Sequence, residues 1–122
     1  MSMNEIINFM KGKGTVKNYS SKTLWVVETD TNHPHGPAIA HLLGARKRTP
    51  RGLDADGFKR ADGKSIRGHK AWWKVYGHIA ARVYDYGEKV AVSGFIVKVP
   101  ETQFDQGAGE DVKKVIFDSS PS

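Results

Sequence analysis

The chain has 122 residues, a formal net charge of +6 at pH 7 and no cysteine. This length is typical of one domain with its own core, so we expect residues 1–122 to form a single domain. The absence of cysteine excludes disulfides, thiolate metal ligands and cysteine nucleophiles. Neither a secretion signal nor a run of about 18 apolar residues is present, so we expect a cytoplasmic protein without a membrane partner.

Positive charge is concentrated in residues 44–70. This stretch holds nine Lys and Arg residues against three Asp residues, so its net charge of +6 equals that of the whole chain. From residue 100 onward, five acidic residues against two Lys residues give a net charge of −3. We therefore expect one side of the molecule to be basic and another to be acidic.

The first half of the chain predicts one short helix followed by strands. The helix is expected over residues 4–10, between an asparagine cap and two glycines. Residues 15–19 and 23–29 are rich in β-prone residues and predict two strands that together favour a hairpin. Residues 30–37 contain two prolines and a glycine and predict a loop. An apolar run at residues 38–43 predicts a further strand.

Residues 44–70 predict a long, basic, glycine-rich connection. A short strand is expected near residues 57–60, with tight turns at Asp56-Gly57 and Asp62-Gly63. Long connections of this kind inside a compact domain are either functional or mobile.

Residues 72–99 show the strongest β pattern and predict a hairpin with its turn at residues 85–88. Alternate residues starting from Trp73 form an apolar row, which we assign to the core. The opposite row is aromatic and basic. A β-bulge at Ser93-Gly94 is expected to bring the large apolar residues of the returning strand to the core face: Val90, Val92, Phe95, Val97 and Val99.

Residues 112–117 predict a last strand, and residues 118–122 predict a frayed tail. Strand follows strand without helical crossovers. The predicted fold is therefore mainly β: a single-domain antiparallel sandwich or small barrel of about six or seven strands with a short N-terminal helix.

The aromatic and basic row supplies the candidate binding surface. With three arginines of the basic stretch, it contains Trp72, Lys74, Tyr76, Arg82, Tyr84, Arg46, Arg48 and Arg51. We expect a small non-catalytic binding or interaction module that contacts a protein or small ligand through this face, with self-association into a homodimer as a variant. Flat rings beside cations also hold single-stranded nucleic acid, which is an alternative partner.

A second alternative is a metal-dependent enzyme that uses His33, His35 and His41. Pro34 separates the first two histidines and indicates a turn, in which the His-x-His spacing loses its strand geometry. No Gly-x-Ser-x-Gly element and no phosphate-binding glycine loop occurs, so the sequence assigns no catalytic residue, metal or cofactor. It favours binding over catalysis.

Overall fold

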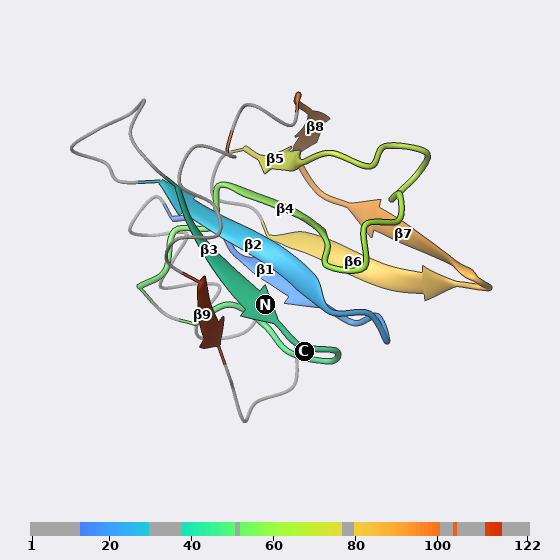
Figure 1. The fold of residues 1–122 in the computed structure, drawn as a ribbon, viewed down its shortest axis with the longest axis horizontal. Coiled ribbons are helices and arrows are strands. Elements are labelled where there is room, and N and C mark those ends of the chain that lie inside the picture. The colour runs from blue at the N-terminus through green and yellow to red at the C-terminus, as the bar shows by residue number, and fades with distance from the viewer. Residues whose placement is uncertain are drawn as a thin grey trace.

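The computed structural model describes residues 13–29, 38–50, 52–76, 80–100, 104 and 112–115 (Figure 1). The predicted helix at residues 4–10, the loop at residues 30–37 and the tail at residues 118–122 lie outside the described residues. Within the described residues the protein is mainly β and contains no helix, so no described helix is long and apolar enough to cross a membrane. The bounds of the described strands are β1 Val16–Asn18, β2 Leu24–Thr29, β3 Ala38–Leu43, β4 Gly57–Arg60, β5 Trp73–Val75, β6 Ala81–Tyr86, β7 Lys89–Ser93, β8 Ile96–Lys98 and β9 Val112–Val115.

These strands form two sheets. One sheet has the order β1-β6-β7 and the other has the order β8-β5-β4-β2-β3-β9. Most pairings are antiparallel as expected, but β1 pairs with β6 and β3 pairs with β9 in parallel. A purely antiparallel sheet arrangement is therefore wrong, because strands far apart in the sequence are brought together at both places.

The predicted hairpin between the first two strands is also wrong. β1 pairs with β6, whereas β2 pairs with β3 and β4 in the other sheet. The cause lies in Asn18, whose amide nitrogen donates to the carbonyl oxygens of Lys22 (2.7 Å) and Gly44 (3.0 Å). Its amide oxygen accepts the Ser20 backbone N–H at 3.1 Å. These side-chain bonds turn the chain between the two sheets instead of letting it fold back on β1.

The hairpin predicted over residues 72–99 is confirmed in its pairing, but it is bent across both sheets. β5 pairs with β8 in the six-stranded sheet, while β6 pairs with β7 in the three-stranded sheet. In the β5–β8 half, the numbers of two paired residues add up to 171, as in Lys74↔Val97. In the β6–β7 half they add up to 175, as in Arg82↔Ser93. Between these two paired halves the first arm therefore contains four more residues than the returning arm.

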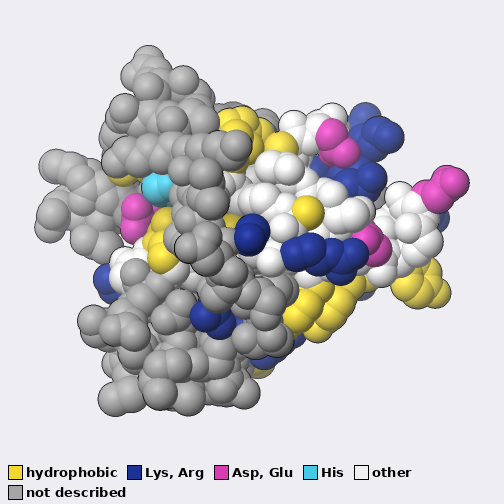
Figure 2. Space-filling model, turned by 90° about the horizontal axis from the view of Figure 1, so that it is seen from below, with side chains coloured by type: hydrophobic (Ala, Val, Ile, Leu, Met, Phe, Trp, Pro, Cys, Tyr) yellow, Lys and Arg dark blue, Asp and Glu magenta, His cyan; other side chains and the backbone are white. Residues whose placement is uncertain are grey.

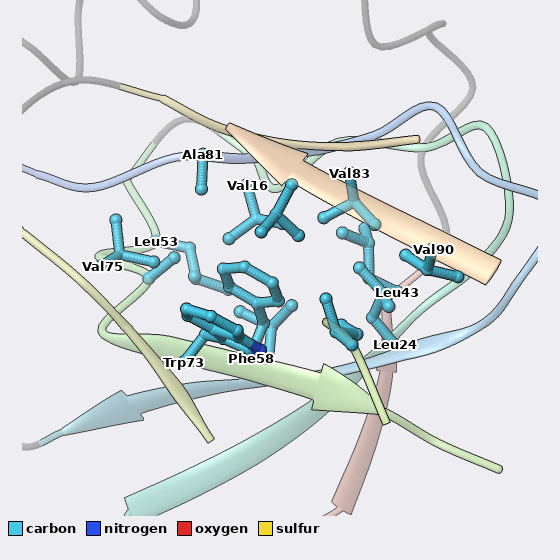
Figure 3. Close-up of a cluster of buried hydrophobic side chains, with 14 residues drawn as sticks. Val16, Leu24, Leu43, Leu53, Phe58, Trp73, Val75, Ala81, Val83 and Val90 are labelled. Carbon is cyan, nitrogen blue, oxygen red and sulfur yellow. The ribbon is translucent and has the colours of Figure 1, made fainter. Parts of the chain in front are cut away.

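Side chains of both sheets meet in one core (Figure 3). The apolar row predicted from Trp73 is confirmed at its described positions, because Trp73, Val75, Ala81 and Val83 all belong to this cluster. Phe58 of β4 lies among them and is fully buried. The same odd-numbered positions thus face the core on both described sides of the bend.

The bulge expected at Ser93-Gly94 is wrong, because this dipeptide is the corner at which the chain changes sheets. Gly94 has a φ of +121°. A Cβ atom there would lie 2.9 Å from the Ala80 carbonyl oxygen and 3.1 Å from the Ala81 Cα. Ile96, and not Phe95 or Val97, packs against the core after this corner.

The basic connection contains the short strand predicted near residues 57–60, which is β4. The turn at Asp62-Gly63 is confirmed, with Gly63 at a φ of +78°. The turn expected at Asp56-Gly57 is wrong, since Gly57 begins β4. A Cβ atom on Gly57 would lie 2.6 Å from the Phe104 ring, so close packing is the reason for this glycine.

Candidate functional site: a basic groove beside β7

The structure separates the predicted aromatic and basic residues into two groups. Arg82 and Tyr84 lie on β6 in the three-stranded sheet, where Tyr84 is 38% exposed. Lys74 lies on β5 in the other sheet, and Tyr76 follows it. Because the two groups lie in different sheets, they do not form the single strand face predicted from alternation. Figure 2 shows Lys and Arg side chains beside hydrophobic ones on one face of the described molecule.

Trp72 is not part of any exposed face. Its side chain is only 1% exposed, and its ring packs edge-on against Phe104 at 5.9 Å. The Lys59 ammonium nitrogen lies 4.4 Å from the centre of the ring. The predicted exposure of Trp72 is wrong because the reverse face of the six-stranded sheet has a small core of its own, which includes Trp72 and Val27.

Arg46 makes contacts within the fold. Its guanidinium donates to the Tyr19 carbonyl oxygen and lies 3.7 Å from the Asp85 carboxylate. Asp85 also accepts the Ser21 backbone N–H at 3.0 and 3.1 Å, and these bonds, with Arg46 nearby, hold the pKa of Asp85 below its ordinary value. This brace ties the 20–22 turn to β6. Arg48 forms a backbone bridge with Lys17, and Arg51 lies outside the described residues.

Tyr84 also has an intramolecular partner. Its ring stacks on that of Tyr19, with 5.0 Å between the ring centres and 6° between the planes. One face of the Tyr84 ring is therefore covered by the protein itself. Tyr86, two residues further along β6, is 74% exposed.

A groove of about 910 Å³ lies between residues 60–70 and the β6–β7 hairpin. In Figure 1 the segment that follows β4 passes beside this hairpin. One wall carries Lys64, Arg67 and Lys70, and the other carries Tyr86, Lys89 and Val92. Only Lys70, Arg67 and Lys64 of this set belong to the basic stretch singled out by composition.

An ion pair between the buried Arg60 and the exposed Asp62 orders the first part of the cationic wall. Arg60 is 5% exposed, and its guanidinium donates to the Asp62 carboxylate at 3.0 and 2.5 Å. Asp62 also accepts the Lys64 backbone N–H at 3.0 Å. The bond from Arg60, more than any other contact, holds the pKa of Asp62 below its ordinary value. Asp62 therefore fixes the path of the chain as it enters the groove.

A tight turn orders the second part of this wall. Ile66 and His69 exchange backbone hydrogen bonds at 3.0 Å, and Ile66 is buried beneath them. His69 is fixed by its ring nitrogen Nε2, which lies 2.9 Å from the Trp72 carbonyl oxygen. The two residues at the tip, Arg67 and Gly68, have φ angles of 51° and 80°. Left-handed backbone is unfavourable for arginine, so the fold holds Arg67 at this tip against its local preference.

Four cations line the groove, and one of them, Lys64, interacts electrostatically with Asp62. The side chains of Lys64, Arg67, Lys70 and Lys89 are all exposed. None of them forms a hydrogen bond or ion pair with another described side chain, and Glu88 is the remaining acidic residue of the lining besides Asp62. The groove is therefore a site of unbalanced positive charge.

The groove also exposes the backbone edge of β7. The backbones of Ala81 and Val83 face β1, because Ala81 N–H donates to Thr15 and the Val83 carbonyl accepts from Tyr19. Val83 pairs with Val92, so the N–H and C=O groups of Val92 face away from β6. The same alternation applies to Val90. No described strand pairs with this edge of the sheet.

The predicted histidine site is only partly described, since His33 and His35 lie outside the described residues. His41 is 7% exposed, and its Nε2 atom lies 3.6 Å from Glu28 Oε1. Neither ring nitrogen of His41 has a hydrogen-bond partner among the described residues. No group of three metal-ligating side chains occurs within the described ranges. The pair of His41 and Glu28 is therefore the only support for a metal site among the described residues.

Sequence reasoning missed Lys89 and Tyr86, the groove residues of the hairpin. The sequence does show that both residues lie at the predicted turn of residues 85–88. It does not show that this turn lies beside residues 61–70. Three features define the site: the open edge of β7, the ordered cationic wall and the exposed ring of Tyr86. The chain matches no protein-family model, no curated protein and no solved structure, so its function has to be inferred from this chemistry.

Proposed function

We propose that this protein is a non-catalytic binding module that takes up an extended, acidic peptide segment of a partner protein as an added strand beside β7. The observation that carries the proposal is the open β7 edge inside a groove lined by four exposed cations. The two sheets share one core, which supports the predicted sandwich as a rigid scaffold for such a groove.

The backbone of β7 supplies the affinity that does not depend on sequence. An extended peptide beside Val90 and Val92 meets the outward N–H and C=O groups of both residues. Each hydrogen bond formed there contributes about 0.5–1.5 kcal/mol net. Addition of a strand to an open sheet edge is a common mode of peptide recognition.

The cations supply the selectivity. Lys64, Arg67 and Lys70 stand on one wall and Lys89 on the other, so acidic side chains on either side of an added strand meet positive charge. Positively charged segments, such as lysine-rich peptides, are repelled by the same cations. Because these cations are exposed, we expect the affinity to weaken as the salt concentration rises.

Single-stranded nucleic acid is the second candidate, and the exposed ring of Tyr86 favours it, because bases stack on such rings beside cations. The open β7 edge argues for the peptide. A strand edge offers alternating donors and acceptors, whereas a phosphate backbone offers acceptors and leaves the outward carbonyl groups of Val90 and Val92 without a partner.

The proposal is tested by fluorescence polarisation with a labelled peptide of alternating glutamate and valine, compared with a labelled thymidine oligonucleotide. We expect the peptide to bind and Arg67→Asn to weaken it about tenfold. Asparagine tolerates the left-handed backbone at this position, so the variant removes the charge and retains the turn.

The matched control is Lys47→Gln, which removes one charge from the same basic stretch but outside the groove. Its affinity for the peptide should equal that of the unmodified protein. No peptide binding, or equal loss in both variants, would overturn the proposal. Tighter binding of the oligonucleotide with the same dependence on Arg67 would replace the peptide by nucleic acid.

A further inference from the structure

A second exposed surface lies at the opposite end of the bent hairpin and is apolar. Phe95 is 63% exposed, Val97 is 47% exposed and Tyr76 is 45% exposed. Tyr76 N–H donates to the Phe95 carbonyl oxygen at 2.8 Å, so the two rings lie on adjacent strands. Lys74 pairs with Val97, and its ammonium nitrogen lies 4.8 Å from the centre of the Tyr76 ring. These contacts place the apolar side chains together on one face.

This surface borders an open sheet edge. β8 is the end strand of the six-stranded sheet, and β5 is its only described neighbour. The inward backbone groups are those of Phe95 and Val99, which bond to Tyr76 (2.8 Å) and Trp72 (3.1 Å). By alternation, the backbone groups of Ile96 and Lys98 point outward from the edge.

We infer that β8 is the contact through which two copies of this chain associate, with their β8 strands paired antiparallel about a two-fold axis at Val97. In this register the outward groups of Ile96 meet those of Lys98 in the other copy, and each pair exchanges two hydrogen bonds. Val97 lies opposite Val97, at the close spacing of a pair without hydrogen bonds. The two six-stranded sheets then form one continuous sheet.

The side chains are complementary in this arrangement. Each Lys98 lies opposite Ile96, so no like charges face each other directly. Phe95 lies opposite Val99, which is half-buried against the second core cluster. The exposed apolar side chains of one copy thus cover those of the other, and a second copy fits this edge without any further partner.

The short length of β8 limits the strength of the contact. A strand of three residues offers few hydrogen bonds, and Pro100 lies two residues beyond its end. Small interfaces of this kind are weak. We therefore expect reversible association in the micromolar to millimolar range, independent of the groove beside β7.

The test is sedimentation velocity of the full chain over a concentration series that reaches the millimolar range. We expect a monomer–dimer equilibrium whose dissociation constant rises more than tenfold in Val97→Lys, because this substitution places two ammonium groups opposite each other. Val97 is already half-exposed, so the melting temperature of this variant should be unchanged.

Two control variants make the result specific. Val97→Thr keeps the branched shape and should retain association, and Tyr86→Lys adds the same charge on β6 and should not affect it. A monomer at every concentration, or association that persists in Val97→Lys, would overturn the inference. Arg67→Asn should leave association intact, so failure here and failure of peptide binding are distinguishable.

Discussion

The open edges of β7 and β8 lie within a few residues of each other in the sequence, yet their chemistry is opposite. β7 borders a groove that is lined by exposed Lys and Arg side chains. β8 borders a surface formed by Phe95, Val97 and Tyr76, all of them at least 45% exposed. The same returning arm of one hairpin supplies both edges, because it changes sheets at Gly94. One bend therefore gives the protein two open strand edges of different chemistry, which we propose as two separate recognition surfaces.

This difference predicts how each edge discriminates between partners. At β7 we expect charge to select the partner and salt to weaken the interaction. At β8 we expect the contact of apolar side chains to dominate and salt to have little influence. Backbone hydrogen bonding is common to both edges and carries no sequence information.

The largest effect is expected at the bend itself. In Gly94→Ala the new Cβ would meet the Ala80 carbonyl oxygen at 2.9 Å, and the φ of +121° is strained for any L side chain. We expect a loss of about 2–4 kcal/mol in the free energy of unfolding, measured by urea denaturation. Gly63→Ala is the matched control, because its φ is also positive (+78°) but nothing lies within 4 Å of the new atom; it should cost about 1 kcal/mol. Equal losses in both variants would show that the corner is not tightly packed.

The next effect concerns the cationic wall. Asp62→Asn removes the charged partner of Arg60, whose side chain is 4% exposed. We expect a loss of about 1–3 kcal/mol in the free energy of unfolding, since a buried guanidinium is left without its counter-charge. Peptide binding should fall with it while self-association is kept, because no residue of β8 lines the groove. Equal impairment of peptide binding and association in the folded variant would contradict the independence of the two edges.

The same carboxylate predicts a dependence on pH. The pKa of Asp62 is lower in the folded protein than its ordinary value of 3.8. A lowered pKa means that the stabilisation is fully present above the ordinary value and is lost as the pH falls through the folded value. Thermal melts between neutral pH and pH of about 2 should therefore show a smaller acid-induced loss in Asp62→Asn than in the unmodified protein. Identical acid profiles would show that Asp62 does not contribute to the acid sensitivity.

A crossed comparison of Arg67→Asn and Val97→Lys sharpens the contrast further. Arg67→Asn should weaken peptide binding about tenfold and leave self-association unchanged, and Val97→Lys should have the reverse effect. Polarisation and sedimentation measured on the same two preparations test this directly. A variant that impairs both activities while remaining folded would indicate that the two edges are coupled.

The smallest effect is expected at Asp85, which is an exposed residue near the end of β6. Its carboxylate braces Ser21 and lies 3.7 Å from Arg46, but exposed ion pairs contribute little to stability. Asp85→Asn should lower the melting temperature only slightly and change neither edge. A large decrease in the melting temperature would mean that the 20–22 turn is essential to the junction of the two sheets.

Part of this fold could be predicted from the sequence. Alternation alone identified Trp73, Val75, Ala81 and Val83 as core residues, because a strand buries every second side chain whichever sheet it joins. The bend could not be predicted, since Ser93-Gly94 is equally compatible with a bulge in one sheet and a corner between two. This one ambiguity hid the exposure of Phe95 and Val97.

The site was predictable to a smaller extent. Composition located the basic stretch that contains Arg67, but it did not show that Arg60 pairs with Asp62 while the neighbouring cations are exposed in a groove. Lys89 was missed because it comes close to this stretch only through tertiary contacts. Pairing and proximity of this kind depend on the packing of the two sheets, and no local pattern contains them.

The central proposal is that an acidic strand adds to β7, and amide hydrogen exchange followed by NMR tests it most directly. The full chain is measured with and without the glutamate–valine peptide. Strand addition predicts that the amides of Val90 and Val92, which face the groove, become protected in the complex, while those of Ile96 and Lys98 on the other edge are unchanged. Peptide binding without protection at Val90 and Val92 would contradict the proposal.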